Sequence, residues 1–142
     1  MSNNSSITTD SLGVNGAKLG NSGAISITSQ AATMDTGSVI SSSSKSLGSA
    51  GQISVNTTNG IALTNSSIST DVQNGTQSSQ TGKIALNAQA GAITLDGSTV
   101  SSTTSGDANA GDMVLSASGS LQLSNNAKIT TCLLYTSDAA DE

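Results

Sequence analysis

The sequence predicts an all-β protein, a right-handed parallel β-helix (β-solenoid) with one coil per repeat of 28–31 residues and three short strands per coil. Three observations predict this fold class. A pattern that begins with glycine recurs at Gly23, Gly51, Gly82 and Gly111, at spacings of 28, 31 and 29 residues. Aliphatic residues occur in pairs separated by one residue, as in half-buried strands. Gly, Ser, Thr and Asn fill the segments between the pairs, and a period of this length is typical of stacked repeats.

The copy over residues 82–110 shows the three predicted strands most clearly. The first strand contains Ile84 and Leu86, the second contains Ile93 and Leu95, and the third lies around Val100 after a tight turn. Because side chains alternate across a strand, both members of each pair point to the same side. We therefore expect these aliphatic side chains to share one interior.

The other copies repeat these strands in the same order. The predicted array contains a partial copy over residues 1–22 and copies over residues 23–50, 51–81, 82–110 and 111–131. The third strand contains Ile7 in the partial copy and Val39 in the looser copy that starts at residue 23. The remaining expected inward pairs are Ile25/Ile27, Ile53/Val55 and Met113/Leu115 for the first strands, and Ile61/Leu63 and Leu121/Leu123 for the second strands.

Stacking is expected because one copy buries too few aliphatic side chains to offset the entropy of ordering its backbone. Neighbouring coils pair strand on strand and bury a continuous apolar column. The right-handed coil follows from the usual preference of parallel crossovers. Both ends of such a stack leave strand edges unpaired, so we expect self-association through the exposed coil ends.

Residues 132–142 differ from the repeats and resemble a translated sequencing adapter. They contain the only Cys, the only Tyr and the only Glu of the chain, and they follow directly on the last repeat residues. We interpret them as a non-native tail and exclude them from the fold prediction. Without the tail the acidic residues fall from 9 to 6, and with four lysines the net charge becomes 4 − 6 = −2.

Composition excludes several classes of function. The repeats have no cysteine for a disulfide framework and no basic run for a nucleic-acid partner. No apolar run approaches the roughly 20 residues of a transmembrane helix, and no signal peptide follows Met1. Because the chain opens within a repeat, we expect its true start to lie upstream.

We expect no enzyme activity, and we assign no catalytic, cofactor-binding or metal-binding residue. The repeats lack His, Arg, Glu and aromatic residues, and their aspartates lie mostly in or near turns (Asp10, Asp35, Asp71, Asp96, Asp107 and Asp112). For these aspartates, a role in capping turns is favoured over a role as paired carboxylates in hydrolysis. Weak calcium binding by turn aspartates and an ice-binding array of outward threonines stay open, although no calcium-binding repeat occurs and the Thr positions alternate with Ser.

The repeats resemble those of filamentous-haemagglutinin-like adhesins, which are large exoproteins of two-partner secretion. The resemblance covers roughly residues 3–131. It is carried most clearly by Gly82, Ile84, Leu86, Ile93, Leu95, Gly97, Ser98, Val100, Ser105, Gly106, Asn109, Ala110 and Gly111. It implies a long β-helical shaft that is exported through an outer-membrane transporter. The family's amino-terminal secretion domain does not occur in this sequence.

The expected function is therefore structural: a fragment of the shaft of a secreted or surface-displayed adhesin that acts in attachment or biofilm formation. The resemblance implies a Gram-negative bacterium or cyanobacterium as the source and leaves the receptor unidentified. Two alternatives stay open. The chain could supply non-catalytic coils of a β-helical carbohydrate-active enzyme, because that fold also hosts such enzymes. It could also belong to a matrix or S-layer-like protein.

Overall fold

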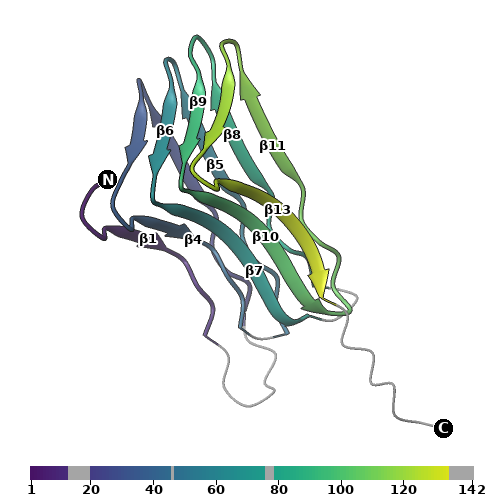
Figure 1. Ribbon diagram of the computed structural model, residues 1–142. Coiled ribbons are helices and arrows are strands. Elements are labelled where there is room, and N and C mark those ends of the chain that lie inside the picture. Colours follow the sequence, from purple (N-terminus) through teal and green to yellow (C-terminus); the bar gives the residue numbers. More distant parts are fainter. Residues whose placement is uncertain (13–19, 46, 76–78, 135–142) are drawn as a thin grey trace, which may run out of the picture.

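The computed structural model describes residues 1–12, 20–45, 47–75 and 79–134 of the 142-residue chain. These residues form thirteen β-strands and no helix. The strands wind through three parallel sheets into a β-solenoid of about four turns (Figure 1). This confirms the predicted all-β solenoid with three strands per coil, and its right-handedness stays a prediction. Residues 13–19 of the partial copy and residues 135–142 of the tail lie outside the described residues.

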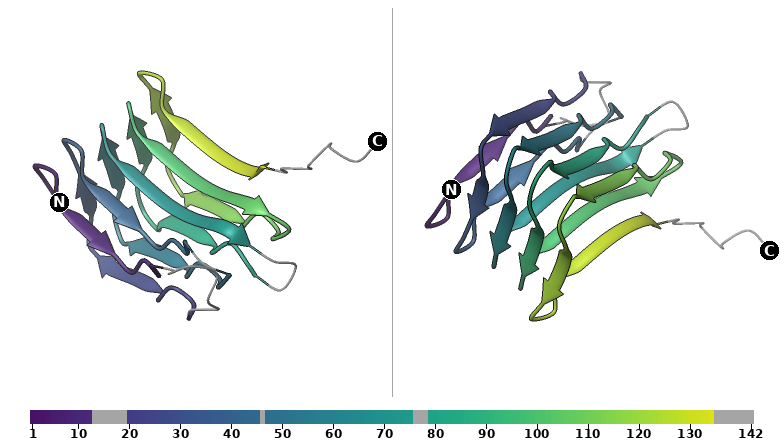
Figure 2. Two further views of the ribbon diagram at one scale, coloured as in Figure 1. Left: turned by 90° about the horizontal axis from the view of Figure 1, so that it is seen from below. Right: turned by 90° about the horizontal axis from the view of Figure 1, so that it is seen from above.

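Each sheet collects one strand from successive coils. Sheet A contains β1 (Ser6–Thr8), β4 (Val39–Ser41), β7 (Ser67–Gly75), β10 (Thr99–Gly106) and β13 (Lys128–Leu134), in that order. Sheet B contains β2 (Ile25–Ser29), β5 (Ile53–Thr57), β8 (Ile84–Ala88) and β11 (Met113–Ala117). Sheet C contains β3 (Ala32–Met34), β6 (Ile61–Thr64), β9 (Ile93–Asp96) and β12 (Leu121–Ser124). Figure 2 shows the coils side by side, with β1 and β13 at opposite ends of the stack.

The register places equivalent repeat positions on top of one another. Ile53 pairs with Ile84 in sheet B, and Ile61 pairs with Ile93 in sheet C. In sheet A, Ile68 pairs with Val100. Because the copies stack in register, each inward position becomes a column of aliphatic side chains that runs along the solenoid.

The aliphatic columns form the main core, as predicted. The largest fully buried apolar side chains belong to the inner coils: Ile40, Ile53, Ile61, Leu63, Ile68, Val72, Ile84, Leu86, Ile93, Leu95 and Val100. The last described coil differs, because no other described coil covers it. Leu121 and Leu123 point inward at the same positions as Ile93 and Leu95 but are 47% and 46% exposed.

Val39 lies in the third strand of the copy at residue 23, as predicted, but the inward residue of that strand is its neighbour Ile40. Ile40 pairs with Ile68 and is 2% exposed. The corner before this strand contains one more residue than the corner before β10. Thr36 and Gly37 both adopt positive φ, of 48° and 73°, where Gly97 alone does so before β10. The longer corner shifts the inward position by one residue.

A second interior region, which we call the glycine seam, lies where the chain enters sheet B. It consists of Gly51, Gly82 and Gly111 on one side and Ser42, Thr70 and Ser102 of the sheet A layer on the other. The three hydroxyl residues are fully buried. The Ser42 hydroxyl accepts a hydrogen bond from the Gly51 N–H at 2.9 Å and donates one to the Gly23 carbonyl at 2.9 Å. The Thr70 hydroxyl donates to the Gly82 carbonyl at 2.9 Å.

The last strand runs three residues past the predicted end of the array. In β13, Cys132, Leu133 and Leu134 pair with Thr103, Thr104 and Ser105 of β10. Strand pairing uses backbone groups that every non-proline residue carries, so an unrelated sequence can extend an edge strand. The non-native origin of residues 132–142 therefore stays a prediction.

Candidate functional site

The outer faces of sheets B and C present small, mostly uncharged side chains. On sheet B the outward positions between the inward pairs hold Ser26, Ser54, Ala85 and Val114, which stack in that order. A second outward row holds Thr28, Asn56, Asn87 and Ser116. Hydroxyl and amide groups of this kind can hydrogen-bond to a ligand, but they provide neither an acid nor a base at neutral pH.

The threonine-rich segments of sheet A do not form one outward array. Thr8 lies in a row with Ser41, Ser69, Ser101 and Thr130. The neighbouring row contains Thr70 and Ser102, and both of these side chains are fully buried in the glycine seam. The alternation of the strand thus places Ser69 and Ser101 on the outer face and their neighbours Thr70 and Ser102 in the interior.

Asp35 and Asp96 occupy the same position at the corner after the second strand, as the repeat predicts. The coil that carries Thr64 separates them in the stack. The Asp96 carboxylate accepts hydrogen bonds from the Ser124 hydroxyl at 3.0 Å and from the Asn125 amide. One carboxylate oxygen of Asp35 is buried and has no hydrogen-bond partner among the described residues. Asp96 therefore caps a corner, and Asp35 lacks the equivalent donors.

Two other aspartates contact hydroxyl groups on the outside of sheet A. The Asp10 carboxylate accepts hydrogen bonds from the Ser41 hydroxyl and the Ser43 backbone N–H, both at 2.9 Å. Asp71 lies within β7 and accepts a hydrogen bond from the Thr103 hydroxyl. Asp71 is thus a strand residue rather than a turn residue. In both cases the carboxylate joins neighbouring coils.

A polar groove of about 380 Å³ runs along the corner between sheets A and B. Its lining includes Gln52, Gln80, Lys83, Asn109 and Asp112. Lys83 and Asp112 are the charged residues of this lining, and both are exposed to solvent. The groove offers amide and backbone groups to a ligand but no pairing of a nucleophile with a base.

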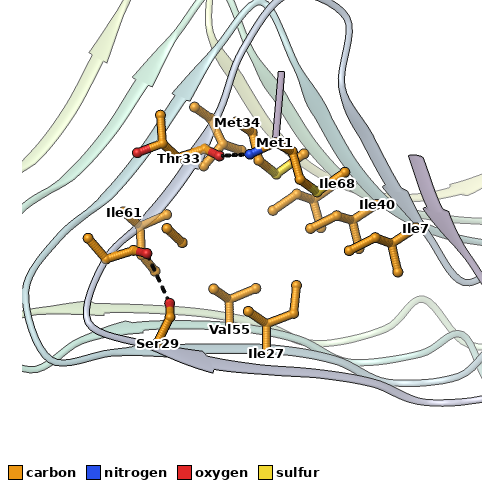
Figure 3. Close-up of a pocket in the computed structure, with 13 residues that line it drawn as sticks. Met1, Ile7, Ile27, Ser29, Thr33, Met34, Ile40, Val55, Ile61 and Ile68 are labelled. Carbon is orange, nitrogen blue, oxygen red and sulfur yellow. Dashed lines mark hydrogen bonds between the residues drawn. The ribbon is translucent and has the colours of Figure 1, made fainter. Parts of the chain in front are cut away.

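An apolar cavity of about 260 Å³ opens at the end of the stack that carries β1 (Figure 3). Ile27 and Met34 line it from sheets B and C, and Ile7 and Ile40 line it from sheet A. Met1 lies across the opening, and its terminal ammonium group donates a hydrogen bond to the Thr33 carbonyl. The cavity is the uncovered interior of the solenoid at this end.

The described residues contain no group of three or more His, Cys, Asp or Glu side chains that could hold a metal ion. Within the same parts of the chain, no helix is long and apolar enough to cross a membrane. In the interior, the side chains that cluster are thus aliphatic residues and hydroxyl groups. On the surface, aspartate carboxylates accept hydrogen bonds from hydroxyl groups.

Comparisons with known proteins found no matching family model, no matching curated relative and no matching solved structure. The structure therefore establishes the chain as a parallel β-solenoid built from stacked sequence repeats.

Proposed function

We propose that this chain is part of the repetitive shaft of a large secreted or surface-displayed bacterial adhesin, with a structural role in attachment or biofilm formation. The observation that carries the proposal is the uninterrupted stack of coils, in which every sheet continues from one repeat to the next. A stack of this kind has a length set by the number of repeats, because each coil contacts only its neighbours. It suits a spacer that holds a distal binding region away from the cell.

The resemblance of the repeats to filamentous-haemagglutinin-like adhesins supports the same function. The positions that carry the resemblance include Ile84, Leu86, Ile93 and Leu95, which form the buried columns, and Gly82, which lies in the glycine seam. By the same resemblance, we propose export through an outer-membrane transporter and a location outside a Gram-negative bacterium or cyanobacterium. The transporter would then be a partner of the full protein.

We propose a non-catalytic role for the described coils. Their outward rows carry hydroxyl and amide groups, and the Asp71 and Asp96 carboxylates accept hydrogen bonds from residues of the next coil. These contacts support the stack. The function then depends on the number and continuity of coils rather than on any one outward side chain.

Two in-frame deletions in the bacterium that carries the gene test this proposal. Removing residues 82–110 deletes one whole coil and joins Thr81 to Gly111, so that β7 can pair with β13 and β5 with β11. We expect secretion and surface attachment to persist, with a shorter shaft. Removing residues 82–96 deletes two strands of three, and we expect both properties to be lost.

Deleting the whole gene should reduce attachment to surfaces, measured by adherent cells and biofilm mass. Unchanged attachment would overturn the adhesin function. If the protein that lacks residues 82–110 is displayed normally but no longer supports attachment, a binding or catalytic site lies on that coil. This second outcome would overturn the spacer role.

A further inference from the structure

The corner between β5 and β6 leaves one backbone N–H without an acceptor. The Asn59 N–H donates to the Gln30 carbonyl of the preceding coil at 2.7 Å, and the Ile61 N–H donates to the Ala92 carbonyl of the next coil at 2.9 Å. The Gly60 N–H between them donates no hydrogen bond among the described residues. This corner belongs to the row of tight turns at the top of Figure 1.

The corner of the next coil, between β8 and β9, has the same feature. The Ala90 N–H donates to the Thr58 carbonyl at 2.8 Å, just as the Asn59 N–H donates to the coil before it. Gly91 follows Ala90 as Gly60 follows Asn59, and within the described parts of the chain the Gly91 N–H also donates to no acceptor. The free N–H is therefore a property of this corner of the solenoid rather than of one residue.

The sequence places an asparagine directly before the free N–H in one coil. Asn59 is exposed to solvent, and its side-chain amide makes no hydrogen bond to any described residue. Its carbonyl accepts a single long contact, of 3.5 Å, from the Thr57 hydroxyl. Asparagine is one of the chemically labile residues of proteins. The amide carbon of Asn59 and the nitrogen of Gly60 are thus both free to react with each other.

Other exposed or glycine-linked asparagines lack this combination. Asn65 is also exposed, but the following N–H, that of Ser66, donates to the Ser98 hydroxyl at 3.1 Å. Asn74 precedes a glycine too, but it lies within β7, where Gly75 pairs with Gly106 of β10. A third Asn-Gly pair, at residues 15–16, lies outside the described residues.

We propose that Asn59 is a site of self-modification, where the Gly60 nitrogen attacks the side-chain amide and the asparagine becomes aspartate or isoaspartate. A bond forms between the Gly60 nitrogen and Cγ of Asn59, the Cγ–Nδ2 bond breaks, and ammonia leaves with the proton of the Gly60 N–H. Water then opens the resulting succinimide ring. The net change replaces an amide nitrogen with a water oxygen, so no oxidant, reductant or cofactor takes part. Glycine favours ring closure because it has no side chain in the way.

The two products differ in the length of the backbone. If water attacks the side-chain carbonyl of the ring, aspartate forms and the main chain is unchanged. If water attacks the main-chain carbonyl, isoaspartate forms, and the main chain then runs through the former side chain and is longer by one carbon. Both products add a carboxylate to the corner, so comparing them separates the effect of charge from that of backbone length.

The corner has no room for the longer backbone. A Cβ atom on Gly91 would lie 2.5 Å from the carbonyl carbon of Asn59, so the two coils are in contact at this peptide. The Gly60 carbonyl accepts a hydrogen bond from the Ala32 N–H at 3.1 Å, and Ile61 is bonded to the coil on the other side. An additional carbon displaces both groups from their partners. Isoaspartate at position 59 therefore loosens the stack toward both neighbouring coils.

The modification acts as a slow change that needs no enzyme and weakens the solenoid next to β6 as the protein ages. It rests on the corner geometry and not on the proposed adhesin function, so either can fail without the other. Because it concerns a corner between inner coils, it applies equally when further coils extend the stack.

Peptide mapping of the full chain tests the site directly. The chain is incubated in mildly alkaline buffer, because the attacking nitrogen must lose its proton, and the digest is analysed for aspartate and isoaspartate by mass spectrometry. A synthetic peptide of residues 55–63 gives the rate without the fold. We expect conversion at Asn59 in the folded chain within about tenfold of the peptide rate. A larger reduction would overturn the proposal, because it shows that the stack holds the reacting groups apart.

Two variants create new Asn-Gly pairs and isolate the role of the free N–H. Ala90→Asn places asparagine before Gly91, whose N–H has no described acceptor, and Ser66→Gly places glycine after Asn65, where the N–H faces the Ser98 hydroxyl. Both positions 90 and 65 are exposed. We expect conversion at position 90 to be about tenfold faster, because at position 65 a hydrogen bond must break first. Equal rates, or faster conversion at position 65, would contradict the proposal.

Hydrogen exchange measures the effect on the stack. In the separated isoaspartate form, the N–H groups of Ala32 and Ile61 should exchange about tenfold faster or more than in the unmodified chain. The Ile84 N–H, which is bonded to the Asp112 carbonyl in sheet B, is the reference and should change by less than about twofold. Asn59→Asp adds the charge without the longer backbone and should leave all three rates within about twofold. Unchanged exchange in the isoaspartate form, or an equal effect of Asn59→Asp, would overturn the loosening by backbone length.

Discussion

The interior of the solenoid has two regions that neighbouring coils fill in different ways. In the aliphatic columns, side chains such as Ile84 and Leu95 fill the space and are completely buried. In the glycine seam, backbones approach so closely that no side chain fits. A Cβ atom on Gly82 would lie 1.8 Å from the Gly51 carbonyl oxygen, and one on Gly111 would lie 2.4 Å from the Gly82 carbonyl oxygen.

This difference separates two requirements on one repeat. The columns need apolar volume and tolerate Ile, Leu or Val at a given position, because the hydrophobic effect has no directional preference. The glycine seam requires glycine at one position and a side chain with a hydroxyl group at the facing position. The hydroxyl is required because the backbone groups there are buried and must be hydrogen-bonded. We therefore expect substitutions in the seam to be tolerated less than substitutions of similar size in the columns.

The largest effect is expected for Gly82→Ala. The added methyl group meets backbone atoms of the preceding coil, so the stack must separate locally, and we expect a loss of more than about 4 kcal/mol in the free energy of unfolding. Gly23→Ala is the matched control, because Gly23 has the same repeat position but its Cβ would lie 3.5 Å from the nearest atom. That control should change stability by less than about 0.5 kcal/mol in urea unfolding. Equal losses of unfolding free energy for Gly82→Ala and Gly23→Ala would show that close backbone contact does not restrict the side chain at position 82.

Leu95→Ala is expected to have the next largest effect. Leu95 is completely buried between coils, and its truncation should cost about 2–5 kcal/mol through lost burial and a residual cavity. Leu123→Ala tests the same column in the last coil, where the side chain is 46% exposed. Measured at a concentration too low for self-association, it should cost less than half as much as Leu95→Ala. Similar losses of unfolding free energy for Leu95→Ala and Leu123→Ala would contradict the idea that a neighbouring coil must cover the column for the side chain to stabilise the fold.

The smallest effect is expected for Thr70→Val, which keeps the shape of the side chain and removes its hydroxyl. The Gly82 carbonyl loses its hydrogen bond from Thr70 and keeps only the longer contact of 3.4 Å from Ser102. We expect a loss of about 1–3 kcal/mol in unfolding free energy, because the carbonyl is buried. Ser69→Ala, at the next and outward position, should change stability by less than about 0.5 kcal/mol. A neutral Thr70→Val would show that the seam does not depend on its hydroxyls.

The sequence by itself determined the solenoid, its three strands per coil and most of the inward positions. The alternation that places Ile84 and Leu86 on one side of a strand is local, and its recurrence at 28–31 residues is visible without a structure. Asp35 and Asp96 were assigned to equivalent corners for the same reason. The pattern did not show that the longer corner before β4 makes Ile40, rather than Val39, the inward residue of that strand.

The tertiary structure alone decided why the repeat begins with glycine and which hydroxyls are internal. Gly51 and Gly82 are separated by 31 residues, and their contact arises only when coils stack about one strand spacing apart. The same stacking turns Thr70 and Ser102 into buried partners of backbone carbonyls. These features depend on distances between coils, which a pattern within one repeat does not contain.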